Sequence, residues 1–306
     1  MQYTVKPEDS GKTVKELIAG LLHPSSKMLK YLKYREDGIL LNGVRVTVRA
    51  IPRPGDILTL SLTDAPDATG PEPVALPLTV LYEDCDLTVP VKPGNMPTHP
   101  SHNHHRDTVA NALAYRYRQD GIPYVFRPVN RLDRETSGLL LVARNKLAAG
   151  RLTASMQAGE IRKTYLAVLV GEDIPDAGEI DRPLHRTAAS IIVREVCAPD
   201  VPDAEPSLTR YRTLCRANGY SLVEASPVTG KTHQLRVHFA SVGHPIVGDT
   251  LYGTPDGIIG RQALHAHTLT FPHPTTGERL TFTAPVPDDM ERLIACRFPG
   301  MKGKFA

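Results

Sequence analysis

The chain has 306 residues, of which 41% are hydrophobic and 23% are charged, and its formal net charge is +3. This composition is ordinary for a globular protein and excludes the disordered, collagen-like and disulfide-rich classes. The four cysteines form no CxxC pair, and the sequence has neither an apolar signal core nor an apolar run that could span a membrane. We therefore expect a reduced, cytoplasmic protein without a membrane segment.

The excess positive charge lies in the first fifth of the chain. Residues 1–65 contain ten Lys or Arg and seven Asp or Glu, whereas the remainder contains 26 of each. A basic segment of this kind fits a nucleic-acid contact. A basic surface without any partner would give the same counts.

In chain order, apolar periodicity first predicts helices over residues 14–22 and 26–34. Strands are expected at 39–41, 44–48 and 57–62. The Asn-Gly pair between the first two strands is typical of a two-residue hairpin turn.

This segment resembles the S4 RNA-binding domain in its basic second helix, its ILLNGVRV hairpin and its closing PGD sequence. It departs from that domain in its two-helix region and in lacking an Arg-rich first helix. The resemblance implies that Lys27, Lys30, Lys33 and Arg35 lie along RNA phosphates. The alternative is a solvated helix face.

A Pro-rich stretch without periodicity follows, and we expect residues 66–77 to link an S4-like domain of residues 1–65 to a second domain of residues 78–306. In the second domain, strands are expected at 78–81 and 87–91. Helices are expected at 108–119 and near 146–158 and 231–242. Strands dominate elsewhere, so the fold class is α+β with a mainly antiparallel, mixed sheet.

The sequence NRLDRETSG at 130–138 precedes an apolar run, LLLVA, at 139–143. The run is predicted to be one strand buried on both faces. Asp133, Arg131 and Arg134 then lie in a polar loop at the mouth of that strand, a common way to fix a reactive group. The alternative is a surface cluster of salt bridges.

A second motif, SPVTGKTHQLRVH, occupies residues 226–238. Its TGKT segment lacks the spacing of a phosphate-binding P-loop, which excludes a nucleotide triphosphatase of that kind. A helix is expected from Thr232, with Leu235, Phe239 and Val242 facing inward. Arg236 on this helix needs a counter-charge if it is buried, and Asp133 is the candidate.

A third motif is the strand RKTYLAVLVG at 162–171. Strand alternation places Lys163, Tyr165 and Ala167 on one face. Tyr165 between a lysine and a small residue suits the floor of a pocket. A tyrosine that only packs within the sheet is the alternative.

Together these motifs resemble the RluA-type pseudouridine synthases. The family's RLDxxTSG signature, followed by LLL, stands at 131–141. Segments that resemble further family motifs are LYEDCDL, KPGNMPTHP, KTY, GEIDRPL, TGKTHQLRVH and GHPIVGDTLYG, so the resemblance spans residues 78–285. The chain departs from the family at Asn130, usually His, at Lys231, usually Arg, and at Val89-Pro90-Val91.

The resemblance implies an isomerisation that breaks the N1–C1′ bond of uridine and rejoins the base through C5, with no cofactor and no metal. Asp133 would be the essential group, attacking C1′ or C6 or taking a proton from C2′. Arg236 would pair with Asp133, and Tyr165 would stack on uracil and assist removal of the C5 proton. Arg131 would fill the space of the flipped uridine. Lys163 and Arg134 would meet phosphates.

The implied partner is RNA, with ribosomal RNA favoured over transfer RNA, bound by a monomer. Two other classes stay open. His99, His102, His104 and His105 cluster in a polar loop and could hold a metal in a hydrolase. The chain would otherwise be an RNA-binding protein without catalysis, against which the presence of Asp133, Tyr165 and Arg236 argues.

Overall fold

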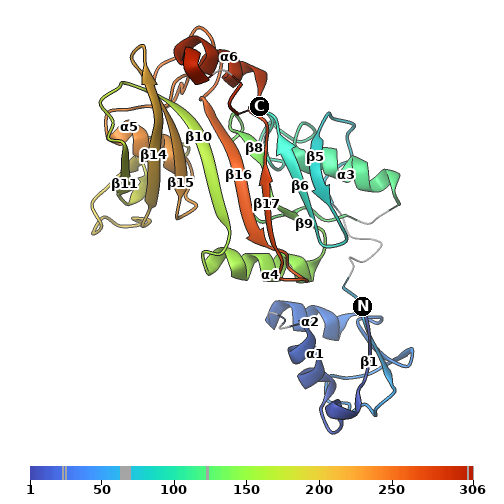
Figure 1. Cartoon of the computed structure of the whole chain (residues 1–306). Helices are drawn as coiled ribbons and strands as arrows, with labels where there is room; N and C mark the ends of the chain where they lie inside the picture. The colour runs from blue at the N-terminus through green and yellow to red at the C-terminus, as the bar shows by residue number, and fades with distance from the viewer. Residues whose placement is uncertain (23, 25, 63–69, 122–123, 302, 306) are drawn as a thin grey trace.

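A computed structural model describes the whole chain except residues 23, 25, 63–69, 122–123, 302 and 306. The first four strands form a small antiparallel sheet in the order β1-β4-β2-β3. Two helices pack on it around a core of their own (Figure 1). The elements are β1 (Gln2–Thr4), α1 (Val14–Leu22), α2 (Ser26–Tyr34), β2 (Ile39–Leu41), β3 (Val44–Arg45) and β4 (Ile57–Leu60).

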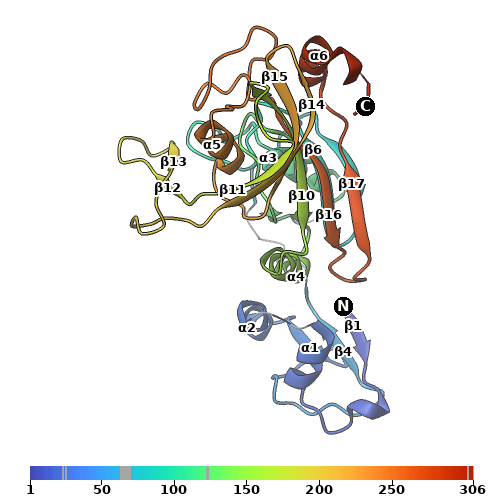
Figure 2. The same cartoon turned by 60° about the vertical axis from the view of Figure 1, so that its left-hand side comes forward.

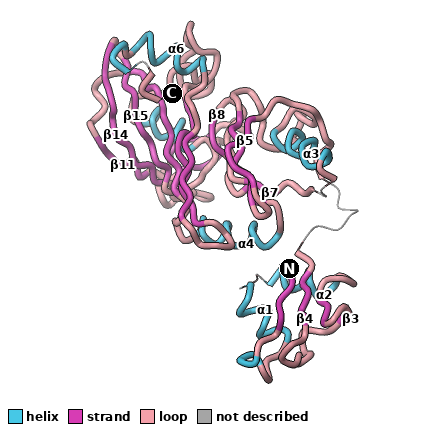
Figure 3. The backbone as a smooth tube through the Cα atoms, turned by 45° about the vertical axis from the view of Figure 1, so that its right-hand side comes forward, coloured by secondary structure: helices cyan, strands magenta, loops and turns pink. Residues whose placement is uncertain are grey.

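Apart from β12 and β13, the remaining strands form an 11-stranded sheet in the described chain, in the order β11-β14-β15-β10-β16-β8-β6-β9-β7, with β17 beside β16 and β5 beside β6. Figure 3 shows this sheet running through the larger part of the molecule. The strands are β5 (Thr79–Glu83), β6 (Leu87–Lys92), β7 (Arg127–Pro128), β8 (Ser137–Leu139), β9 (Val142–Ala143), β10 (Arg162–Val170), β11 (Ala177–Asp181), β14 (Leu208–Ala217), β15 (Tyr220–Pro227), β16 (Leu264–Pro272) and β17 (Arg279–Thr283).

Among the described pairings of this sheet, only β8 and β16 run parallel; the others are antiparallel. The expectation of an α+β fold with a mainly antiparallel sheet is confirmed. A separate hairpin of β12 (Leu184–Arg186) and β13 (Arg194–Val196) projects beside α5 (Figure 2). The helices of this part are α3 (Val109–Gln119), α4 (Lys146–Gln157), α5 (Gln234–Ser241) and α6 (Asp288–Arg297).

Two hydrophobic clusters cover the large sheet. The larger joins β10 and β15 to α3, α5 and α6, and the other joins β6 and the far end of β16 to α4. No helix in the described part of the chain is both long and apolar enough to cross a membrane.

Helix α4 also contacts the two N-terminal helices (Figures 1 and 2). Arg151 on α4 donates hydrogen bonds to the carbonyls of Leu21 and Leu22 at the end of α1, at 3.3 and 3.4 Å, and to Pro274 at 2.8 Å. Leu147 packs into the N-terminal core, and the Lys146 ammonium lies over the ring of Tyr31. One arginine therefore bridges the two parts of the chain.

The helices expected at 14–22 and 26–34 are confirmed, as is the Asn-Gly turn, where Asn42 and Gly43 have φ of 51° and 81°. The return strand expected at 44–48 is wrong beyond Arg45. The carbonyls of Val48 and Ala50 instead accept the first N–H groups of α1, so this segment leaves the sheet to satisfy a helix end.

The single strand expected at 139–143 is also wrong, because β8 and β9 are separate there. The helix expected from Thr232 begins later, at Gln234. Residues 66–69 of the expected linker lie outside the described residues. Of its remainder, Glu72 and Val74 are hydrogen-bonded to Asn111 on α3.

Candidate active site

Asp133 lies in the loop that leads into β8, and its side chain is 27% exposed. Hydrogen bonds fix the peptide groups on both sides of Asp133. Thr98 donates to the carbonyl of Leu132 at 2.9 Å, and the backbone N–H of Thr136 donates to the carbonyl of Asp133 at 3.1 Å. A partly exposed carboxylate therefore sits on a backbone with little freedom.

Lys92, at the end of β6, supports the same loop from inside. Its fully buried ammonium donates to the carbonyls of Pro93, Met96 and Arg134 at 2.7–2.8 Å. Burial, and then the charge of Arg261, lower the pKa of Lys92 to about 7. Lys92 is thus committed to backbone carbonyls rather than to substrate.

Arg261 and Gln262 reach the loop from the segment before β16. Arg261 donates to the carbonyl of Glu135 at 2.9 Å and pairs through two nitrogens with Asp289, while Gln262 donates to the hydroxyl of Thr136 at 3.2 Å. Parallel pairing of β8 and β16 explains this contact, because it brings the segments before both strands to the same end of the sheet.

Arg236 on α5 faces Asp133, as the sequence predicted, with its Nη1 3.3 Å from the Asp133 Oδ2. Its main partner is a different residue, Asp249, which accepts from Nε and Nη2 at 2.7 and 2.8 Å. Both side chains of this pair are buried. Burial opposes ionisation of Asp249, but the hydrogen bonds from Arg236 hold its pKa below the usual value. Asp249 lies within the GHPIVGDTLYG motif, and the sequence predicted no role for it.

His233 and Tyr252 also lie beside Asp133, and the sequence predicted a role for neither. His233 Nδ1 lies 2.8 Å from the Tyr252 hydroxyl, and its Nε2 lies 3.9 Å from Asp133 Oδ2. The guanidinium of Arg236 lies over the Tyr252 ring at 5.0 Å. The backbone N–H of Arg194 on β13 donates to the Tyr252 hydroxyl at 2.9 Å.

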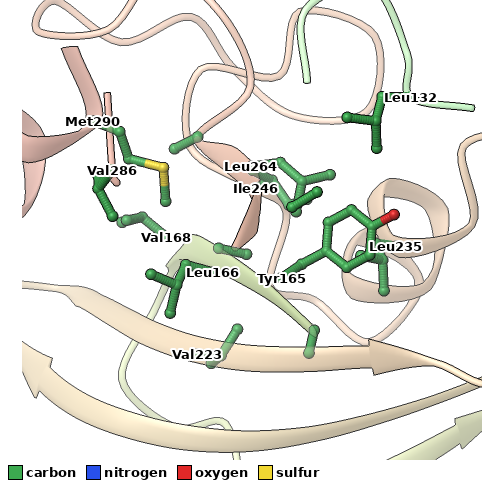
Figure 4. Close-up of a cluster of buried hydrophobic side chains, with 14 of the residues drawn as sticks. Leu132, Tyr165, Leu166, Val168, Val223, Leu235, Ile246, Leu264, Val286 and Met290 are labelled. Atoms are coloured by element: carbon green, nitrogen blue, oxygen red, sulfur yellow. The ribbon is translucent and has the colours of Figure 1, made fainter. Parts of the chain in front are cut away.

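Tyr165 lies on β10 near Asp133. Its side chain is buried, with Leu132 and Leu235 around the ring in Figure 4. Burial, and then the nearby charge of Asp133, raise the pKa of Tyr165, so the phenol stays neutral. The sequence placed Tyr165 at a pocket floor, and the structure brings it near Asp133.

The other residues expected to contact the RNA are more widely separated. Arg131 is exposed, and its charge helps lower the pKa of His99, after burial. Arg134 is half exposed and pairs with Glu135 at 2.9 Å. The half-buried Lys163 points its ammonium toward Gly230, 3.7 Å from where a Cβ would lie there.

The basic residues of the N-terminal part lie on a different surface. Lys30 and Lys33 are exposed on α2. Arg35 is engaged by Asp37 through two nitrogens and by the Tyr31 hydroxyl. The side chain of Lys27 lies outside the described part.

The comparisons with known proteins agree with this site. Residues 86–241 match the family described as RNA pseudouridylate synthase. The chain belongs to the RNA pseudouridylate synthase family. It is 37% identical over 284 residues to YjbO of Bacillus subtilis, named an uncharacterized RNA pseudouridine synthase, covering 92% of this chain and 98% of that one.

Further relatives extend this result. The chain is 34% identical over 312 residues to the ribosomal large subunit pseudouridine synthase D of Vibrio cholerae, covering 96% of this chain and 94% of the relative. Among solved structures, the human RNA pseudouridylate synthase domain containing 1 protein superposes with a TM-score of 0.57 at 31% identity, covering 68% of this chain and 83% of that one. The protein is thus an RNA uridine-to-pseudouridine isomerase.

Asn130 departs from the histidine usual in RluA-type synthases, and the structure gives it a clear task. Its side-chain oxygen accepts from the backbone N–H of Leu141 at 2.8 Å, and its nitrogen donates to the carbonyl of Leu139 at 3.4 Å. These bonds fill the gap between β8 and β9. Satisfied backbone groups allow this break to remain buried.

Lys231, the second departure, pairs with Glu205 at 3.1 Å. The turn itself is held by Gln234, whose side-chain oxygen accepts from Thr229 and from the backbone of Lys231 at 2.7 and 3.0 Å. The third departure, Val89-Pro90-Val91, forms part of β6, and Pro90 accepts the backbone N–H of Leu140.

The histidine-rich loop does not gather into a metal site. His104 pairs with Asp107 at 2.6 Å. Over the described residues, no three His, Cys, Asp or Glu side chains converge as a metal-binding group.

Proposed function

We propose that this synthase isomerises specific uridines of ribosomal RNA and that Asp133 is its essential catalytic residue. The ribosomal substrate rests on relatives such as the Vibrio cholerae large subunit synthase, and transfer RNA is the second candidate. The protein would act as a monomer in the cytoplasm, with residues 1–65 as an S4-like RNA-binding domain. The four free cysteines suit a reducing compartment.

The observation that carries the role of Asp133 is its position: a partly exposed carboxylate on a fixed loop, facing a buried guanidinium and near a buried tyrosine. The N1–C1′ bond must break, the uracil must rotate, and a C5–C1′ bond must form as C5 loses its proton and N1 gains one. An ionised carboxylate in a water-poor site suits attack at C1′ or C6 as well as proton removal from C2′. Arg236 donates a hydrogen bond to this carboxylate and orients it.

The neighbouring side chains divide the remaining tasks. Tyr165 offers a ring on which uracil stacks. Its raised pKa favours this role over removal of the C5 proton, because a phenol that holds its proton tightly is a poor base. Exposed Arg131 would fill the space left by the flipped uridine. Lys163, Arg134, Lys27, Lys30 and Lys33 would contact phosphates.

Asp133→Asn tests the assignment, since it keeps the shape of the side chain and removes its charge. We expect tritium release from RNA containing 5-tritiated uridine to fall below detection while RNA binding is retained. Asp107→Asn, which changes an exposed aspartate in the 92–107 loop, is the matched control and should keep full activity. Substantial release by Asp133→Asn would refute the role of Asp133. No release by the unaltered protein on any cellular RNA would favour RNA binding without catalysis.

A further inference from the structure

Two hydrogen bonds link the β12–β13 hairpin to His233, and the ring of His233 faces Asp133. The backbone N–H of Arg194 donates to the Tyr252 hydroxyl at 2.9 Å, and this hydroxyl lies 2.8 Å from His233 Nδ1. The other ring nitrogen of His233, Nε2, lies 3.9 Å from the Asp133 carboxylate. The contact of Arg236 with Asp133 accounts for only one N–H donor at that carboxylate.

The partners assign the proton on each atom of this chain. An amide N–H can only donate, so the Tyr252 oxygen accepts from Arg194. The hydroxyl proton of Tyr252 then goes to His233 Nδ1, the one acceptor recorded for it in the described chain. A neutral imidazole that accepts at Nδ1 carries its proton on Nε2. That N–H faces Asp133.

The backbone also directs His233 toward Asp133. His233 precedes α5 with a φ of 57°, in the left-handed region that a residue with a Cβ seldom adopts. Such a conformation persists when its surroundings impose it, and it is frequent where a side chain must be aimed. Before His233, the chain is held by the side chain of Gln234, which accepts from Thr229 and Lys231. After it, the carbonyl of His233 accepts from Val237 and so begins the hydrogen-bond pattern of α5.

We propose that His233 and Tyr252 are positioning residues for Asp133: Tyr252 fixes the tautomer of His233, whose Nε2–H orients the carboxylate together with Arg236. The inference rests on the proposed role of Asp133. It adds a second donor at the carboxylate. It also ties that donor to the backbone of β13, outside the large sheet.

The charges around His233 agree with a neutral ring. Burial lowers the pKa of His233, Arg236 and Arg194 act in the same direction, and Asp133 and Asp249 oppose them without reversing the shift. Burial likewise raises the pKa of Tyr252, which keeps its proton. A second proton on His233 would occupy Nδ1 and remove the acceptor for Tyr252.

Three variants of the full chain test this arrangement by separating the two ring nitrogens. His233→Asn keeps a polar group near the Nδ1 position but has none at Nε2, whereas the amide nitrogen of His233→Gln can occupy the Nε2 position. Tyr252→Phe removes the hydroxyl and keeps the ring under Arg236. Tyr82→Phe, on β5, is the matched control, because it removes a tyrosine hydroxyl bonded to Asp84 outside this site.

Steady-state tritium release should show a loss in kcat at nearly constant KM. Because an N–H that faces the charged carboxylate is lost or misplaced, we expect kcat to fall ~10-fold or more in His233→Asn, to recover partly in His233→Gln and to fall ~3–10-fold in Tyr252→Phe. His233→Gln combined with Tyr252→Phe should lose little beyond His233→Gln alone, since the first change already breaks their link. Tyr82→Phe should match the unaltered protein.

The inference is overturned if the kcat of His233→Asn is within about twofold of that of the unaltered protein. It is also overturned if the loss of kcat in the double variant equals the product of the losses in His233→Gln and Tyr252→Phe. A destabilised histidine variant would show in thermal unfolding, and Tyr252→Phe then decides alone: an unchanged kcat refutes the arrangement. Activity in Asp133→Asn would instead refute the catalytic role of Asp133. The two failures are therefore distinguishable.

Discussion

Arg236 gives its two shortest hydrogen bonds, of 2.7 and 2.8 Å, to Asp249, and only one longer bond, of 3.3 Å, to Asp133. Asp249 compensates the buried guanidinium and sets its plane. Asp133 therefore receives an oriented donor without having to serve as the principal counter-ion. This leaves its carboxylate partly exposed.

Asp249→Ala should lower the free energy of unfolding by ~3–5 kcal/mol, because it leaves the buried Arg236 without its main partner. Urea unfolding measures the change. Asp176→Ala, which breaks the ion pair of an exposed aspartate with Arg216, should cost less than ~1 kcal/mol. Similar losses in the two variants would contradict the structural role of Asp249.

Gly138→Ala should destabilise the protein by several kcal/mol, roughly the cost of a strained backbone plus displacement of packed strands. Gly138 has a φ of 111°, and a Cβ there would lie 2.2 Å from the carbonyl oxygen of Ala266 on β16. Gly150→Ala is the matched control: this glycine lies in α4 with open space around it, so alanine should stabilise by ~0.5–1 kcal/mol. Thermal unfolding of both variants tests the contrast.

The buried His265 should make stability depend on pH. Burial lowers its pKa to about 3, against an ordinary value of 6.5, so the unfolded chain binds a proton that the folded protein excludes. The contribution of neutral His265 to the free energy of unfolding is complete above pH 6.5. It is lost as the pH falls toward 3, by about 1.4 kcal/mol per pH unit. Urea unfolding between pH 7 and 5 should show a shallower slope for His265→Gln than for the unaltered protein. Replacing exposed His102 by Gln should leave the slope larger than in His265→Gln; equal slopes in both would contradict the prediction.

Lys30→Gln combined with Lys33→Gln should weaken RNA binding and reduce the slope of log affinity against log salt by about 1–2, roughly one per lost phosphate contact. Both lysines are exposed on α2. Filter binding over a range of salt concentrations measures the slope, and Lys15→Gln on α1 is a single-charge control. An unchanged slope would remove α2 from the RNA contact. Deletion of residues 1–65 should flatten the slope further.

Local sequence features predicted the local parts of this fold. The bounds of α1 and α2 and the turn at Asn42 follow from periodicity and turn chemistry, which act within a few residues. The break between β8 and β9 could not be predicted in this way. It depends on the side chain of Asn130, whose partners at 139 and 141 become neighbours only when both segments join the sheet.

The residues of the site also fall into those that local motifs predict and those that depend on tertiary contacts. The RLD and HQLR motifs identified Asp133 and Arg236, and charge balance predicted their proximity. The same argument assigned Arg236 one partner when it has two, because sequence cannot rank the distances from a guanidinium to two carboxylates. The TGKTHQLRVH and GHPIVGDTLYG motifs contain Asp249, His233 and Tyr252. The contacts that these residues share depend on how α5 packs against the hairpin and the sheet.

The parallel pairing of β8 with β16 has a mechanical consequence. This pair joins two halves of the sheet, and the Asp133 loop is attached to both: Lys92 holds the carbonyl of Arg134 from one half, and Arg261 holds that of Glu135 from the other. A shear of one half against the other would pull these adjacent peptide groups apart. The rigidity of the joint between the halves thus sets how accurately the carboxylate is held.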